Sequence, residues 1–404
     1  GFLFFIIIII FSFYKSSNLF SSTSLLALLI IGLFDHYLWT SYLGLILFWL
    51  IIGLSLKNFP HISFLEKITS KLLLELSYFT GRDFYRPDYI SLITTFRCNF
   101  KCQTCDIWQK TDFSQEMNII DWLAVSGELK SYLPTTSFIE ISGGEALIKK
   151  DLVLALGSDL KKYFKTVVLN TNGSIITPEI ISELEKIGLD RLKVSLYSLD
   201  EGSHNFIRGA EIAFKNAMKT VELVSKSKIK LEVGILITAH NINQIPALID
   251  YLGSLGDTSI IIQPLDEIIE SNQSKNMINS EMILKLWPEI EKSKELFKWL
   301  KDNSVKIKNS LANLSAIEEY YLEPKKVLKY RCFAGQRNMV VYPTGDLSLC
   351  FKRKFIGNIK KEKLKKIMKR NALLERRSIR GCGKYCRIIG CNFSRGLLEI
   401  MSKK

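Results

Sequence analysis

The sequence predicts an α/β protein built on a parallel sheet. Between residues 88 and 265, short β-branched and apolar runs alternate with longer stretches of helical periodicity. Repeated strand–helix units indicate parallel strands joined by crossover helices. Near the C-terminus, two short strands flank the turn Pro343-Thr-Gly-Asp346, which predicts a β-hairpin. The predicted strands cover 90–95, 138–142, 166–170, 191–197, 231–237 and 259–263, and the helices 116–132, 151–164, 178–187, 210–226 and 243–255.

The first predicted strand runs directly into three cysteines. Cys98, Cys102 and Cys105 have the spacing C-x3-C-x2-C. An electron-transfer four-iron cluster uses four thiolates, one per iron, so three thiolates would leave one iron with an open position. A catalytic zinc site leaves a position open for substrate in the same way. The alternatives are a structural zinc knuckle or three buried thiols, although zinc is usually held by paired C-x2-C units.

This motif, placed directly after a strand, resembles the cluster motif of the radical S-adenosylmethionine (SAM) superfamily. The resemblance implies a [4Fe–4S] cluster that binds SAM and, when reduced, splits it to a 5′-deoxyadenosyl radical. It also implies a partial, TIM-like (β/α)6 barrel with its active site at the C-terminal ends of the strands. The chain departs from the family at Thr104, where an aromatic residue usually contacts adenine. Trp108 is our candidate to replace that contact.

Motifs at the ends of later strands resemble the SAM-binding positions of this family. Ser142-Gly-Gly-Glu-Ala-Leu147 is similar to the GGE motif that meets the amino group of SAM, with Ala146 in place of the usual proline. Two glycines also let a backbone approach a ligand closely. The planar fork of an arginine suits a carboxylate. The resemblance therefore implies as SAM-binding residues Gly143, Gly144, Glu145, Asn172, Ser195 and Arg208.

Several of these residues have plainer explanations. Asn172 precedes a glycine, and turn chemistry alone accounts for an Asn-Gly pair. Ser195 and Arg208 could belong to a solvated loop, and we expect His204 to be a capping or surface histidine. Other polar residues at strand ends are candidates to line a substrate cavity: Thr238, Asn241 and Gln263.

The other five cysteines lie in the last 75 residues. Cys332 and Cys350 flank the predicted hairpin with the spacing C-x12-G-x4-C, which resembles the opening of a SPASM domain. That domain binds auxiliary four-iron clusters. The later C-x3-C-x4-C spacing departs from the full pattern, so the shortened "twitch" version with one auxiliary [4Fe–4S] cluster fits better, and a zinc ribbon is the alternative. The remaining candidate ligands, one of them spare, are Cys382, Cys386 and Cys391.

Residues 1–57 are strongly apolar, and we expect transmembrane helices that attach the chain to a membrane. The best candidate is Tyr42–Leu56, which is followed by lysines and therefore places the catalytic domains in the cytoplasm by the positive-inside rule. A signal peptide would not contain three apolar runs. A buried hairpin is the other alternative. Leu33–Thr40 weakly resembles the closing segments of O-antigen ligase-type membrane proteins.

The net charge of +15 is concentrated near the C-terminus, where residues 352–380 hold 13 Lys and Arg against two Glu. A basic segment can bind nucleic acid or anionic lipid. No aromatic stacking platform accompanies it, so we do not expect nucleic acid as a partner, and a solvated helix face is the plainest interpretation. A radical SAM enzyme needs electrons from outside, which implies a flavodoxin- or ferredoxin-type reductant, and an acidic carrier suits a basic surface.

Together these patterns predict a membrane-attached radical SAM enzyme whose substrate is a peptide, a sugar or a lipid-linked intermediate. The rival prediction is a nucleic-acid-binding or scaffold protein at the membrane whose cysteines hold zinc. The predicted regions are an apolar segment at 1–57, a connector at 58–87, the barrel at 88–265, a helical region at 266–328 and a SPASM/twitch-like domain at 329–404.

Overall fold

A nine-stranded sheet organises the part of the chain that the computed structural model describes, residues 63–266, 280–390 and 393. The strand order is β6-β5-β4-β3-β2-β1-β7-β8-β9, and all neighbours from β6 to β7 are parallel. The prediction of a parallel sheet is therefore confirmed, with each strand within two residues of its expected bounds. The first six strands are β1 (Tyr89–Ile93), β2 (Phe138–Ser142), β3 (Thr166–Thr171), β4 (Arg191–Ser195), β5 (Lys230–Leu236) and β6 (Thr258–Gln263).

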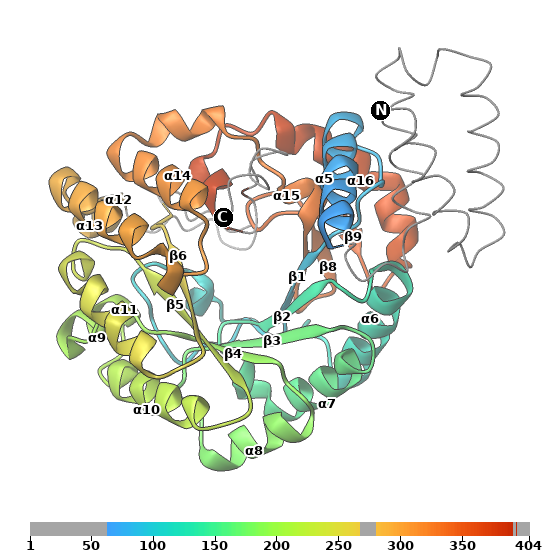
Figure 1. Cartoon of the computed structure of the whole chain (residues 1–404). Coiled ribbons are helices and arrows are strands. Elements are labelled where there is room, and N and C mark those ends of the chain that lie inside the picture. The colour runs from blue at the N-terminus through green and yellow to red at the C-terminus, as the bar shows by residue number, and fades with distance from the viewer. Residues whose placement is uncertain (1–62, 267–279, 391–392, 394–404) are drawn as a thin grey trace, which may run out of the picture. The chain divides into compact units, whose positions relative to one another are not determined.

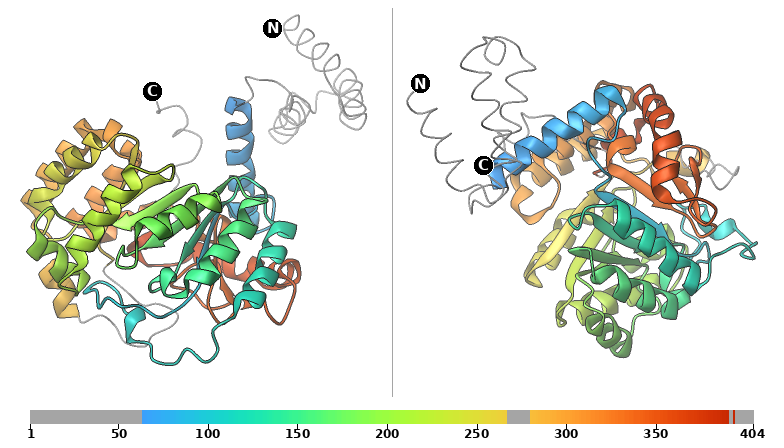
Figure 2. Two further views of the ribbon diagram at one scale, coloured as in Figure 1. Left: turned by 90° about the horizontal axis from the view of Figure 1, so that it is seen from below. Right: turned by 90° about the vertical axis from the view of Figure 1, so that its right-hand side faces the viewer.

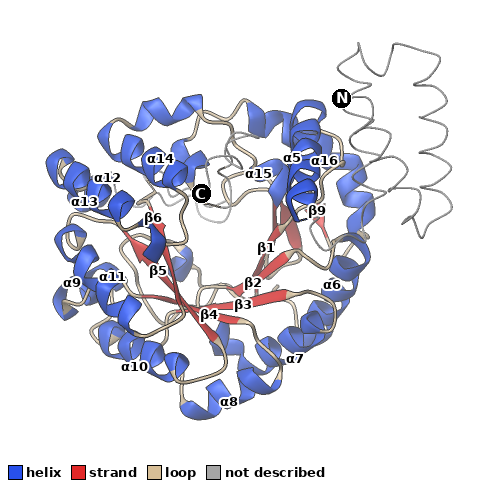
Figure 3. Cartoon of the chain, in the orientation of Figure 1, coloured by secondary structure: helices blue, strands red, loops and turns tan. Residues whose placement is uncertain are grey.

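Crossover helices cover the outer face of the curved sheet (Figure 1). Each predicted helix is present to within three residues, but α9 was missed, because we took its residues for a loop. The helices between the strands are α6 (Ile119–Tyr132), α7 (Lys150–Lys161), α8 (Pro178–Lys186), α9 (Glu201–Arg208), α10 (Ala213–Ser225) and α11 (Ile245–Ser254). The sheet is partly open, because β6 and β9 form its two edges and do not pair with each other (Figures 2 and 3).

The two faces of the strands differ in polarity. Residues that point outward, such as Ile90, Leu92 and Ile141, belong to the main hydrophobic core shared with the helices. Since side chains alternate along a strand, their neighbours point inward, and buried polar residues such as Glu140 and Lys193 occupy that inner face. The barrel interior is therefore polar, which is the surrounding that a bound polar ligand needs.

The C-terminal hairpin continues the same sheet. β7 (Asn338–Val341) pairs in parallel with β1 from Tyr89↔Asn338, and β8 (Asp346–Ser348) and β9 (Gly357–Asn358) follow antiparallel. Gly345 has φ 83°, a left-handed conformation that glycine adopts without strain, and it closes the turn between β7 and β8. The predicted hairpin is confirmed, and its pairing with β1 brings the last cysteines toward the barrel.

The remaining helices precede β1 or follow β6. Helix α16 makes up most of the basic segment 352–380. Its Leu364, Ile367 and Met368 side chains are buried, while Lys365 and Lys369 are exposed. The prediction of a solvated basic helix face is therefore confirmed. These helices are α5 (Ser63–Thr80), α12 (Ser280–Leu286), α13 (Ile290–Asp302), α14 (Leu311–Leu322), α15 (Ala334–Arg337) and α16 (Leu364–Arg380). Short 3-10 turns cover Ile107–Gln109, Ala146–Lys149, Ile242–Gln244, Ser304–Lys306, Pro324–Lys329 and Tyr385–Ile388.

The prediction of membrane attachment is wrong on the present findings. Among the described residues no helix is both long enough and apolar enough to cross a bilayer. The first described helix, α5, has 18 residues but carries four charged side chains, and charge at the centre of a bilayer is costly. Residues 1–57, on which the prediction of transmembrane helices rested, lie outside the described residues. We therefore withdraw both the membrane attachment and the cytoplasmic placement derived from it.

The segment after β6 is fixed by two buried tyrosines of α14. The Tyr321 hydroxyl donates to Ile237 O at 2.8 Å and accepts from Leu265 N at 2.7 Å, while the Tyr320 hydroxyl donates to Leu265 O at 2.9 Å. Both tyrosine side chains are almost fully buried. They tie the ends of β5 and β6 to the helical region that follows.

We predict that Tyr321→Phe lowers the free energy of unfolding by about 1–3 kcal/mol, because two buried backbone groups lose their partner. The matched variant Tyr320→Phe removes the hydrogen bond to Leu265 O and should cost about 1 kcal/mol. Urea unfolding of the full chain, followed by tryptophan fluorescence, gives both values. Equal costs for the two variants would contradict this account of the Tyr321 hydroxyl.

Candidate active site

The three cysteines of the loop after β1 face a cavity of about 360 Å3. The cavity lies at the carboxyl ends of the strands, where the active sites of β/α barrels are found. It collects residues that are up to 168 positions apart in the sequence, from Cys98 to Asp266. The predicted cluster and SAM residues that line it are Cys98, Cys102, Cys105, Gly143, Gly144, Asn172, Ser195 and Arg208.

The start of the cysteine loop pairs with the Gly-Gly-Glu turn after β2. Gly144 N donates to Thr95 O and Glu145 N donates to Arg97 O, both at 2.8 Å, so the ladder between β1 and β2 continues past the strands. A Cβ on Gly144 would lie 2.3 Å from Arg97 O. The glycine is therefore required by the cysteine loop itself, whereas the sequence analysis attributed it to close approach of a ligand.

A second glycine holds the other side of the loop. Gly209 ends α9 with φ 58°, and a Cβ there would lie 2.0 Å from Lys101 O. Gln103 N donates to Ile207 O at 3.0 Å beside this contact. The cysteine loop is thus clamped between the end of β2 and the end of α9.

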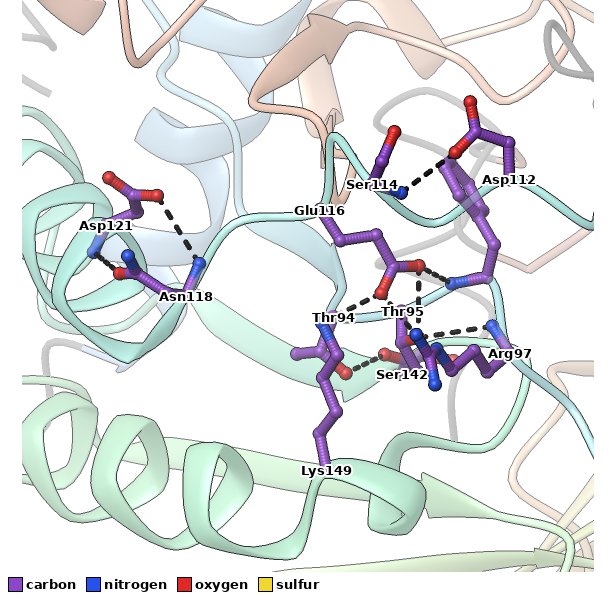
Figure 4. Close-up of polar contacts among 11 residues, drawn as sticks. Thr94, Thr95, Arg97, Asp112, Ser114, Glu116, Asn118, Asp121, Ser142 and Lys149 are labelled. Atoms are coloured by element: carbon purple, nitrogen blue, oxygen red, sulfur yellow. Dashed lines mark hydrogen bonds and ion pairs between the residues drawn. The ribbon is translucent and has the colours of Figure 1, made fainter.

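A buried carboxylate that was not predicted from the sequence binds the start of the cysteine loop as well. Glu116, whose side chain is 3% exposed, accepts from Phe96 N at 2.6 Å and from the Thr95 hydroxyl at 2.9 Å (Figure 4). Its charge is balanced by Lys149 Nζ at 2.8 Å. Because Glu116 and its partners lie on three separate segments of the chain, no local pattern marks Glu116 as part of the site.

Glu145 does not face the cavity. Its carboxylate accepts from Asn172 N at 2.7 Å, from the Thr171 hydroxyl at 2.9 Å and from Leu147 N at 3.1 Å. Burial raises the pKa of this carboxyl, while the hydrogen bonds from Asn172, Leu147 and Thr171 act against that rise. The side chain predicted to accept from the amino group of SAM thus orients the end of β3, including Asn172.

Arg208 places a guanidinium at the wall of the cavity. It donates to the Tyr197 hydroxyl at 3.1 Å and lies over the rings of Phe100 and Tyr197, with its carbon 5.6 and 5.4 Å from their centroids. Burial lowers its pKa, but the nearby Cys102 and Tyr197 outweigh burial and raise it, so the charge is retained. Its buried Nε has no partner among the described residues. A carboxylate in the cavity, such as that of SAM, would satisfy this donor.

Four of the remaining cysteines line a second, small cavity. Their thiols are not joined in disulfides, and burial raises the pKa of Cys332 to about 12. Among the described residues no three His, Cys, Asp or Glu side chains lie close enough to hold a single metal ion. Four thiols around one cavity do match the ligand count of a closed four-iron cluster. These are Cys332, Cys350, Cys382 and Cys386, while Cys391 lies outside the described residues.

The weaker sequence predictions had mixed outcomes. Gln263 lines the catalytic cavity, but Thr238 and Asn241 do not, because Asn241 Oδ1 accepts from Thr238 N at 2.7 Å and both side chains are buried. His204 is buried, not at the surface, and its Nδ1 accepts from Tyr197 N at 3.1 Å. Trp108 and Thr104 both line the cavity. Residues there that sequence reasoning missed include Lys193, Tyr197 and Asp266.

Comparison with known families agrees with this geometry. Residues 92–252 match the radical SAM superfamily. The chain carries a radical SAM domain. Residues 332–392 match the iron–sulfur cluster-binding SPASM domain. The two domains imply a [4Fe–4S] cluster with SAM and an auxiliary cluster, so the predicted enzyme class and cofactors are confirmed.

The relatives share only part of their length with this chain. It is 29% identical over 191 residues to Fe-coproporphyrin III synthase of Methanosarcina barkeri, covering 47% of this chain and 46% of the relative. It is 27% identical over 197 residues to the sporulation killing factor maturation protein SkfB of Bacillus subtilis, covering 48% and 46%. The chain thus spans about half the length of these relatives. The resemblance of residues 33–40 to O-antigen ligase-type proteins is not supported by these comparisons, and those residues lie outside the described part.

A solved structure shares the fold. Streptococcus suis SuiB bound to SAM superposes with a TM-score of 0.55 at 15% identity, covering 78% of this chain and 70% of SuiB. The likeness supports the partly open barrel followed by the C-terminal extension.

We predict that Gly144→Ala reduces the iron bound after anaerobic reconstitution by about four per chain, because the new Cβ must displace the backbone beside Cys98. Gly127→Ala is the matched control, since Gly127 is exposed on α6 and nothing lies within 4 Å of a Cβ there. Iron and acid-labile sulfide analysis measures the effect. Full iron content in Gly144→Ala would show that the clamp is not required.

Proposed function

We propose that this protein binds a [4Fe–4S] cluster through Cys98, Cys102 and Cys105 and reductively cleaves SAM to abstract hydrogen from a peptide. The observation that carries the proposal is the single cavity shared by these thiols and the guanidinium of Arg208. When bound and reduced, the cluster supplies the electron that splits SAM into methionine and a 5′-deoxyadenosyl radical, and the radical then takes a hydrogen atom from a substrate C–H bond.

The chain's own residues would bind and orient SAM. The buried Nε and the remaining donors of Arg208 suit the SAM carboxylate. Ser195 and Asn172, at the ends of adjacent strands, offer hydrogen bonds for the ribose, and Glu145 keeps the end of β3 in place through its bond from Asn172 N. The backbone of Gly143 and Gly144 lines the cavity beside the cysteines.

The same cavity has an apolar wall that would exclude water from the radical. Ile107, Leu236 and Leu265 line it together with the polar groups. A dry, preorganised site protects a reactive intermediate from side reactions.

A peptide is the substrate class that the relatives favour. The chain is 24% identical over 290 residues to the PqqA peptide cyclase of Bradyrhizobium diazoefficiens, covering 69% of this chain and 70% of that enzyme. SuiB has also been solved with its precursor peptide SuiA. Fe-coproporphyrin III synthase shows that the relatives are not confined to peptides, so a sugar or other small substrate is the second candidate.

An auxiliary [4Fe–4S] cluster is assigned to Cys332, Cys350, Cys382 and Cys386, and Cys391, which lies outside the described residues, is not part of the assignment. The support is that the first four line one cavity. A fully ligated cluster has no open iron, so its role is electron transfer or substrate orientation and not SAM binding.

The reductant is proposed to be a flavodoxin or ferredoxin. Radical SAM enzymes need an external electron, and the exposed basic side chains of α16, such as Lys365, Lys369 and Arg377, suit an acidic carrier. The rival interpretation, a zinc-stapled nucleic-acid-binding scaffold, has no support from the matching families.

We predict that Cys102→Ala abolishes 5′-deoxyadenosine formation from SAM and dithionite, because two thiolates cannot hold the catalytic cluster. The fold should persist, since the cysteine sits in a loop. Liquid chromatography quantifies 5′-deoxyadenosine, and circular dichroism checks the fold. An unchanged yield in a folded Cys102→Ala protein would refute the assignment.

A second test addresses the auxiliary cluster. We expect about eight irons per chain in the intact protein and about four when Cys332 and Cys350 are both replaced by Ala. Cleavage of SAM uncoupled from product formation should survive at least in part in that double variant. The Cys391→Ala variant should still bind about eight irons per chain. A loss of about four irons in that variant would show that Cys391 is a ligand of the auxiliary cluster.

A further inference from the structure

One ion pair lies between the catalytic cavity and the cysteine cavity. Lys352 Nζ and Asp266 Oδ2 are 2.5 Å apart. Asp266 lines the catalytic cavity, and Lys352 lines the cavity of the four cysteines. The pair is therefore a direct electrostatic link between two sites that are otherwise separate.

Lys352 is held against the cysteines by its own backbone. Its N–H donates to Cys350 Sγ at 3.4 Å, and its side chain is only 10% exposed. Lys352 lines the cavity of the four cysteines, and Asp266 is paired with its ammonium group. A charge on either residue is thus felt at the position of the auxiliary cluster.

Asp266 is fixed from the other side. It follows Leu265, whose N–H and carbonyl are bound by the hydroxyls of Tyr321 and Tyr320. Its side chain is 25% exposed, more than that of Lys352. Asp266 is therefore the member of the pair that faces the catalytic cavity.

The other cations at the cysteine cavity have different surroundings. Arg353 pairs with Glu375 at 2.8 Å, and Arg387 donates to the carbonyls of Leu328 and Tyr330. Lys384 also lines the cavity. Glu375, Leu328 and Tyr330 do not line the catalytic cavity, whereas Asp266, the counter-ion of Lys352, does.

We propose that Asp266, acting through Lys352, sets the reduction potential of the auxiliary cluster from within the catalytic cavity. The inference rests on the proposed assignment of that cluster to Cys332, Cys350, Cys382 and Cys386. Reduction adds one electron, and hence one negative charge, to the cluster. Lys352 favours that charge and Asp266 opposes it, and a substrate group that hydrogen-bonds to Asp266 weakens the opposition and raises the potential.

The size of the effect follows from Coulomb's law. A unit charge roughly 10 Å from the cluster, at an effective dielectric constant of about 20, changes the equilibrium constant for reduction by on the order of tenfold. Both residues are positioning residues under this proposal, because they act on the cluster and bind no iron.

The test is an EPR-monitored redox titration of the full reconstituted chain with dithionite as the electron donor. The auxiliary signal is identified by its loss in the Cys332→Ala/Cys350→Ala variant. Asp266→Asn should raise its midpoint potential, Lys352→Met should lower it, and the combined variant should lie between the two. Lys352→Arg keeps the charge and should restore a potential close to that of the parent.

The matched control is an exposed ion pair elsewhere in the chain. Lys230 Nζ and Asp257 Oδ2 are 3.3 Å apart, and Asp257→Asn should leave the potential unchanged. Shifts of the same sign in Asp266→Asn and Lys352→Met, or no shift in either, would overturn the proposal. The titration does not depend on SAM cleavage, whereas absence of the auxiliary signal from the parent protein would refute the cluster assignment itself.

Discussion

The site depends on how closely two stretches of backbone approach the cysteine loop. Gly144 on one side and Gly209 on the other leave no room for a Cβ beside Arg97 O and Lys101 O. Three thiols can face one point only if the loop that carries them is held rigidly. The glycines and the buried carboxylate of Glu116 supply that rigidity by contacts with the backbone, and the thiols themselves remain directed to the cavity.

The polar interior imposes a second constraint, because buried charge is costly unless it is paired. Lys193 Nζ meets Glu140 Oε1 at 3.2 Å, and the second oxygen of Glu140 accepts from the Tyr89 hydroxyl at 3.0 Å. Glu145 is satisfied by three donors, as described above. Arg208 retains a buried Nε with no partner among the described residues. Arg208, which lines the catalytic cavity, therefore offers a buried donor to an anionic ligand group there.

The sequence predicted what depends on local pattern and missed what depends on contacts between distant segments. The parallel strands are buried on the side that faces the helices, so their apolar residues form runs that can be recognised in the sequence alone. The spacing of Cys98, Cys102 and Cys105 is also a local pattern, because all three cysteines lie on one loop. The short helix α9 escaped because its eight residues are mostly polar. The role of Glu145 was misjudged because its direction depends on the end of β3, and Glu116 and Asp266 carry no motif of their own.

The pairing of β7 with β1 joins the C-terminal cysteines to the same sheet as the catalytic loop. β1 leads directly into that loop at the carboxyl end of the sheet. β7 runs parallel to β1, but the hairpin reverses the chain, so β8 returns toward the opposite end and Cys350 lies close to the level at which β1 begins. The segment after β6 is held by Tyr320 and Tyr321, and its Asp266 meets Lys352, which follows Cys350. The ion pair therefore joins the segment that follows one edge strand, β6, to the loop between β8 and the other edge strand, β9.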